Sequence, residues 1–173
     1  REFYQDLIRL AGKYPEIKVT IRGKDDAWCG LPEFADVYRA IASTPNVEVD
    51  RNYRDFNVSY ELLAEADLVI ARYTSLAEEA LAAAIPVFVC DYLPAARNVI
   101  AEVYDYHDGH PVFVGSYGDL EARVGRLLRR GEYMPGEDHD RMRETLYGSF
   151  YDGHVVSRLH RELRRIWRST LPR

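Results

Sequence analysis

Apolar and polar positions alternate along the chain with two different periods. In residues 2–14 the apolar side chains recur every three or four positions, as on one face of a helix, and a Tyr-Pro pair then ends the pattern. Residues 17–21 change to strict alternation, which is typical of a half-buried strand. The first part of the chain therefore predicts a helix followed by a strand.

The same helix-then-strand order repeats further along. Helices are predicted in residues 31–44, 59–66, 76–84 and 118–131, and strands in residues 46–50, 67–71, 86–90 and 111–115. The last three strands are continuously apolar, which indicates strands that are covered on both faces. We therefore predict an α/β fold with a doubly wound, Rossmann-like parallel sheet and helices on both faces. The strands 67–71 and 86–90 should be adjacent or near-adjacent central strands, with Val69, Ile70, Val87 and Val89 buried.

The remaining segments fit the same single domain, which spans residues 1–173. Residues 93–109 predict a helix followed by a loop, and Gly131 is expected to end the helix 118–131. Residues 138–170 predict a C-terminal helical segment of one or two helices, so that the domain ends in helices.

Composition narrows the classes of function. The 173 residues are 47% hydrophobic and 29% charged, which describes a soluble globular domain. The net charge of −5 argues against a nucleic-acid partner, and no apolar stretch approaches the ~20 residues that span a bilayer. The two cysteines, Cys29 and Cys90, do not suggest a disulfide framework, so a cytoplasmic location is expected. The five histidines lack the spacing of zinc ligands, and we predict no metal site.

Polar turns after the strands are the candidate ligand-binding positions, because doubly wound sheets bind ligands outside the carboxyl ends of their strands. In the turn 72–75, Thr74 or Ser75 falls at the start of a helix, where free backbone N–H groups can hold a phosphate. The same hydroxyls could equally serve as helix caps, in a capping box with Glu78 or Glu79. The two interpretations are compatible.

The adjacent pair Glu78 and Glu79 lies about 100° apart around the helix, so one carboxylate can point toward the edge of the sheet. A carboxylate about one turn beyond a bound phosphate can accept hydrogen bonds from ribose hydroxyls. Both glutamates could also be ordinary charges at a helix start.

Basic residues in the same turns are candidates for a diphosphate. Arg22 and Lys24 follow the first strand, where Gly23 allows close backbone approach, and Arg72 follows the third. Each of them could instead be a solvated loop residue. After the fourth strand, Asp91, Tyr92 and Arg97 are weaker candidate site residues, in a turn that Pro94 also makes an ordinary loop.

The stretch "LLAEADLVIARYTSLAEEALAAAIPVFVCDY", residues 62–92, resembles the nucleotide-binding half of GT-B-type glycosyltransferases, close to bacterial surface-polysaccharide transferases. Its plan is also similar to glycerophosphotransferases and non-hydrolysing sugar epimerases. The resemblance implies that Thr74 and Ser75 contact the nucleotide diphosphate and that Glu79 binds the ribose. The turn lacks the glycine that is usual in these relatives.

The resemblance implies a donor-binding half of a glycosyltransferase in surface-polysaccharide or related glycan synthesis. The nucleotide-sugar donor is then a substrate, and no cofactor is expected. The glycan or lipid-linked acceptor and the catalytic base would come from a separate N-terminal domain, so no catalytic residue is assigned. The expected location is the cytoplasm, with peripheral attachment to the inner membrane as an alternative. Two other functions stay open, an epimerase-like nucleotide-sugar enzyme and a non-catalytic nucleotide- or partner-binding module.

Relatives of this type open with a strand before their first helix, whereas this sequence starts inside that helix. We therefore expect a fragment. If one strand is lacking, an edge of the strand 17–21 or of the strand 67–71 should be open or filled by another segment.

Overall fold

The computed structural model describes residues 1–23, 25–52, 55–72, 74–90, 112–134 and 154–170. Helices and short parallel strands alternate along it. The elements are α1 (Glu2–Lys13), β1 (Val19–Ile21), the 3-10 turns η1 (Ala27–Gly30) and η2 (Pro32–Phe34), α2 (Ala35–Ala42), β2 (Val47–Val49), α3 (Phe56–Glu65), β3 (Val69–Ala71), α4 (Leu76–Ala82), β4 (Val87–Cys90), β5 (Phe113–Val114), α6 (Tyr117–Arg130) and α8 (Val155–Thr170).

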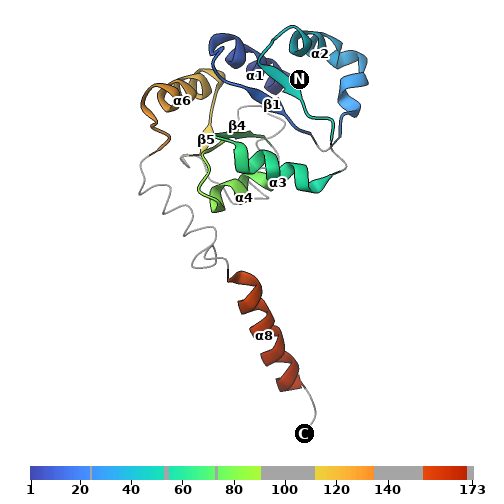
Figure 1. The fold of residues 1–173 in the computed structure, drawn as a ribbon, viewed down its shortest axis with the longest axis vertical. Coiled ribbons are helices and arrows are strands. Elements are labelled where there is room, and N and C mark those ends of the chain that lie inside the picture. Colours follow the sequence, from blue (N-terminus) through green and yellow to red (C-terminus); the bar gives the residue numbers. More distant parts are fainter. Residues whose placement is uncertain (24, 53–54, 73, 91–111, 135–153, 171–173) are drawn as a thin grey trace.

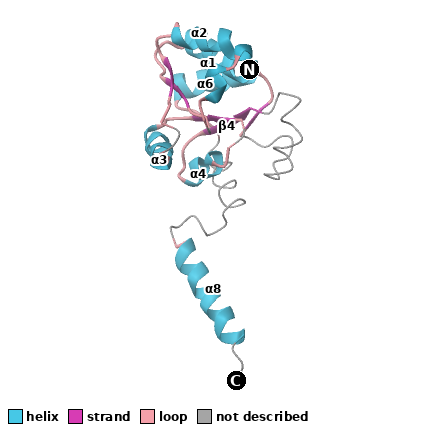
Figure 2. Cartoon of the chain, turned by 90° about the vertical axis from the view of Figure 1, so that its right-hand side faces the viewer, coloured by secondary structure: helices cyan, strands magenta, loops and turns pink. Residues whose placement is uncertain are grey.

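The strands form two small parallel sheets, one of order β1-β2 and one of order β3-β4-β5. Figures 1 and 2 show α1, α2 and α6 on one side of the strands and α3 and α4 on the other. The prediction of an α/β fold with parallel strands is confirmed. The prediction that β3 and β4 are adjacent is also confirmed. The prediction that both are central strands is wrong for β3, which is an edge strand among the described strands.

Each of the two sheets ends in an open edge. Within the residues that the structure describes, β1 pairs only with β2, and β3 pairs only with β4. An open edge at one of these strands was expected from the sequence. The further expectation that the chain is a fragment stays a prediction.

Helix α1 joins the two sheets through side chains. Its residues Leu7 and Ala11 belong to a buried cluster with Ile21 of β1, whereas its Leu10 packs with Phe88 of β4. Phe3, also on α1, contacts both of these clusters and the third cluster around α4. The core is therefore continuous across the two sheets, although the backbone ladder is not.

The expectation of four buried side chains on β3 and β4 was half correct. Val87 and Val89 are buried, but Val69 and Ile70 are only partly buried. The physical reason is the position of β3 at the edge of its sheet, where β4 is the one described strand that pairs with it. Continuous apolar character therefore did not distinguish a central strand from an edge strand.

The helix ends follow capping chemistry. Helix α3 begins three residues earlier than predicted, because the side chain of Asp55 accepts a hydrogen bond from the backbone N–H of Asn57. Helix α6 ends as predicted at Gly131, whose φ of +66° is the left-handed conformation that glycine tolerates. Helix α4 ends without a glycine, and Ala84 adopts a φ of +62° instead.

Helix α8 confirms helix within the predicted C-terminal segment, whose first part, residues 138–153, lies outside the described residues. Figure 1 shows α8 lying apart from the strands and the other helices. Among the described residues no helix combines the length and the apolar character that crossing a membrane requires.

Candidate functional site

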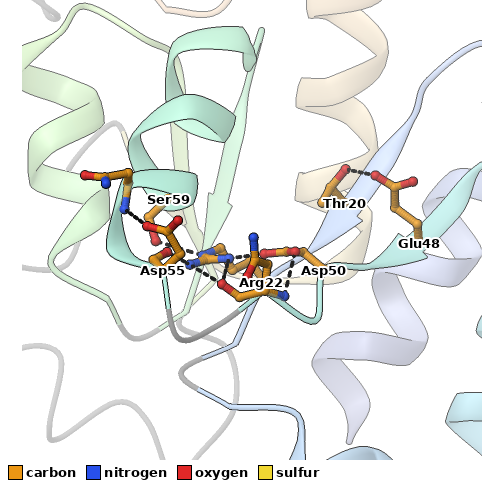
Figure 3. Close-up of polar contacts among 8 residues, drawn as sticks. Thr20, Arg22, Glu48, Asp50, Asp55 and Ser59 are labelled. Atoms are coloured by element: carbon orange, nitrogen blue, oxygen red, sulfur yellow. Dashed lines mark hydrogen bonds and ion pairs between the residues drawn. The ribbon is translucent and has the colours of Figure 1, made fainter.

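Arg22, the first candidate residue, lies directly after β1, and its side chain contacts residues at the end of β2 and at the start of α3 (Figure 3). Its guanidinium forms an ion pair with Asp50, which directly follows β2. It also donates hydrogen bonds to Ser59 Oγ at 2.7 Å and to the backbone carbonyl of Asp55 at 2.9 Å. The protein itself therefore uses most of the donors of this guanidinium. A contact between Arg22 and a ligand stays a prediction.

Gly23 fits this turn for a structural reason. A Cβ at this position would lie 2.8 Å from the carbonyl oxygen of Asp25 and 3.5 Å from the indole nitrogen of Trp28. The loop therefore folds back tightly onto its own backbone. Trp28 stacks on Tyr4 at a centroid distance of 4.4 Å, and Phe34 packs edge-on against both rings.

Arg72 lies directly after β3. Burial raises the pKa of Tyr4, the charge of Cys29 adds to this effect, and the positive charge of Arg72 opposes it. Burial and the charge of Arg72 lower the pKa of the N-terminal amino group, so Arg72 lies within electrostatic reach of the beginning of α1. Ile70 of β3 and Trp28 of the loop after β1 both pack against the buried cluster that contains Ile21 of β1. Strand β3 therefore lies close to β1 and to the loop that follows it.

At the start of α4, the hydroxyl groups of Thr74 and Ser75 have different roles. Thr74 Oγ1 accepts a hydrogen bond from the backbone N–H of Leu76 at 3.2 Å. Ser75 occupies the N-cap position, but its exposed side chain makes no capping hydrogen bond. Thr74 therefore supplies the local cap, and the hydroxyl of Ser75 faces solvent.

The two glutamates of α4 differ in environment. Glu79 is exposed, and its hydrogen bond and negative charge raise the pKa of Tyr60 on the neighbouring helix α3. Glu78 is half-buried, and burial together with the charge of Glu79 raises the pKa of its carboxyl group. Of the two carboxylates, that of Glu79 is therefore the accessible one, and it accepts a hydrogen bond from the phenol of Tyr60.

Four predicted candidates lie outside the described residues: Lys24, Asp91, Tyr92 and Arg97. Cys90 is fully buried, as expected for a core thiol. The described residues include no cluster of three histidine, cysteine or acidic side chains that could hold a metal ion.

Sequence reasoning did not identify Asp50 and Tyr60, the partners of Arg22 and Glu79. The parallel pairing of β1 and β2 could have identified Asp50. Ile21 pairs with Val49, and the residues that follow these two are Arg22 and Asp50. The contact of Tyr60 depends on how α3 and α4 pack on one face, which no local pattern reveals.

A shallow hollow of ≈ 290 Å³ lies elsewhere, beside β2 and the end of α2. It is lined by Tyr38, Ile41, Ala42, Thr44, Pro45, Val47, Glu48, Val49 and Arg51. None of the predicted site residues contributes to it, so it gives no support to the candidate site.

No family model, curated protein or solved structure matches this chain.

Proposed function

We propose that this chain binds a nucleotide-sugar donor as the nucleotide-binding part of a GT-B-like glycosyltransferase. The observation that carries the proposal is the packing of β3 against the side-chain cluster of β1, where each strand has an open edge among the described residues. In doubly wound sheets, ligands bind at the carboxyl ends of the strands, where the strand order reverses.

The crossovers indicate where that reversal lies. Helix α2 connects β1 to β2 on one side of the strands, and α4 connects β3 to β4 on the opposite side (Figure 2). Because crossovers between parallel strands are right-handed, connections on opposite sides lead in opposite directions along a sheet. The β1-β2 pair and the β3-β4-β5 sheet thus extend away from a common point between β1 and β3. This supports a doubly wound arrangement with its switch point there.

The side chains around this point suit a nucleoside diphosphate. Arg72 supplies a positive charge, and the hydroxyls of Thr74 and Ser75 supply donors for phosphate oxygens. The carboxylate of Glu79 lies one turn along α4 and is accessible for ribose hydroxyls. In this proposal Arg22 maintains the turn after β1 and does not contact the ligand.

A thermal-shift panel of UDP, GDP, CDP and CMP on the 173-residue chain tests the proposal. A specific ligand raises the unfolding midpoint by mass action. Calorimetric titration of the best ligand should then show about 1–3 kcal/mol weaker binding for Glu79→Ala, because a hydrogen bond to a charged group is lost. Ser75→Ala should weaken binding and leave stability nearly unchanged, because its side chain caps nothing.

Glu61→Ala is the matched control, since it removes an exposed carboxylate from α3. It should bind like the wild type. If no nucleotide shifts the midpoint, the proposal is wrong, and a partner-binding module becomes the better interpretation. If Glu61→Ala and Glu79→Ala bind equally well, Glu79 has no role at the ribose.

A further inference from the structure

Helix α8 carries an exposed aliphatic stripe. Val156, Leu159 and Leu163 are 59%, 56% and 53% exposed, and they recur at intervals of three and four residues. This spacing places them in one row along the helix. Large aliphatic side chains aligned in this way are typical of a helix face that binds to another surface.

The opposite side of α8 is strongly basic. At about 100° per residue, Arg161 and Arg165 fall on the side of the helix opposite the aliphatic stripe, and Arg164 lies on its flank, about 100° from Leu163. All three are exposed. The helix contains five of the 23 basic residues of the chain but only one of its 28 acidic residues. A basic helix thus belongs to a chain whose net charge is −5.

We propose that α8 binds the surface of an anionic lipid bilayer, with the aliphatic stripe in the interface and the arginines among the headgroups. A helix with separated aliphatic and arginine-rich faces and low overall hydrophobicity is typical of interfacial binding. Each arginine near an anionic leaflet adds electrostatic attraction to it. With 16 residues α8 lies on the surface and does not span the bilayer.

The chemistry favours a bilayer over the other occupants of such a face. Nucleic acid would bind the arginines but would leave the aliphatic stripe in water. A second copy of α8 would cover the stripe but would leave the arginine-rich faces without an anionic partner. An anionic bilayer satisfies both faces at once. The inference does not depend on the proposed nucleotide site.

Co-sedimentation of the full 173-residue chain with vesicles tests the proposal. The vesicles contain phosphatidylcholine alone or with one third phosphatidylglycerol. We expect binding to the anionic vesicles, weaker binding at high salt, and little binding to the neutral ones. Arg161→Glu/Arg164→Glu should lower partitioning by about tenfold or more, and so should Leu159→Gln/Leu163→Gln.

Matched variants on the rest of the chain separate a specific role of α8 from general effects. Arg126→Glu/Arg130→Glu makes the same change in net charge on α6. Leu31→Gln/Leu128→Gln removes two aliphatic side chains that are each 41% exposed. Both controls should bind vesicles like the wild type.

Several outcomes would overturn the inference. Absence of binding to anionic vesicles is one, and loss of binding in the control variants is another. Self-association in sedimentation velocity that the leucine variant abolishes would assign the stripe to a second copy if vesicle binding is absent. Binding to an oligonucleotide that needs the arginines but not the leucines, again without vesicle binding, would assign the basic face to nucleic acid.

Discussion

Replacing Arg22 with lysine should loosen the junction of β1, β2 and α3. The guanidinium pairs with Asp50 and also donates to Ser59 Oγ and the carbonyl of Asp55 (Figure 3). A lysine keeps the charge, but its single nitrogen cannot replace a planar group that reaches three partners in different directions. Arg22→Lys is therefore a test of geometry at constant charge.

The magnitude follows from the bonds that lysine loses. If the ammonium stays with Asp50, the charge-assisted bonds to Ser59 and Asp55 are lost, and such bonds contribute about 1.5–3 kcal/mol each when shielded. The side chains of Arg22 and Asp50 are 14% and 16% exposed, so water replaces part of this loss. We expect Arg22→Lys to lower the free energy of unfolding by about 1.5–3 kcal/mol. Arg22→Met should cost about 3 kcal/mol or more, because it leaves the half-buried carboxylate without its cation.

Urea unfolding followed by circular dichroism measures these differences, with Arg126→Lys on α6 as the exposed control. A double-mutant cycle with Asp50→Asn isolates the ion pair. If Arg22→Lys unfolds like the control, the network contributes nothing and the argument fails. If nucleotide affinity falls while stability does not change, Arg22 is a ligand contact after all, as the sequence first suggested.

Two other positions give sharp expectations for stability. Ala84→Gly should raise the free energy of unfolding by about 0.5–1 kcal/mol, because glycine accepts the φ of +62° without strain, whereas Ala83→Gly at φ −78° should give no gain in the same urea titration. Tyr133 is half-buried and donates to the carbonyl of Val87 at 2.6 Å, and partial burial raises its pKa to about 12. Its contribution to stability is then complete below its unfolded pKa near 10 and is lost as the pH rises through about 12, so Tyr133→Phe should reduce the alkaline fall in stability. The fall should not vanish, because the pKa of Tyr117 is also raised to about 12, and an unchanged alkaline profile in Tyr133→Phe would contradict the assignment.

The sequence predicted those parts of the fold that depend on local periodicity and on special backbone residues. Helix α1 and the end of α6 at Gly131 are examples. An apolar stripe is recognised from its spacing, and a left-handed helix end is recognised from its glycine. The start of α3 was placed too late, since Asp55 lies outside the apolar pattern that marked the helix.

The contacts of the candidate site were harder to predict, because they depend on which strands and helices become neighbours. Arg22 meets Asp50 only because β1 and β2 pair in parallel, in the register Ile21 to Val49. Glu79 meets Tyr60 only because α3 and α4 lie on the same side of the strands. Sequence reasoning thus located the turns that carry the site but not the partners of their side chains.

The junction between the two sheets connects the fold with the proposed function. Within the described residues no backbone pairing joins β1 to β3, so side chains such as Phe3 and Ile70 maintain their relative position. A ligand at the proposed switch point would touch the turn after β3 and also the turn after β1. Its binding energy would then add to the packing that joins the sheets, because a ligand stabilises the arrangement it binds. A ligand that contacted Arg72 alone would stabilise the chain by mass action but would not hold the two sheets together.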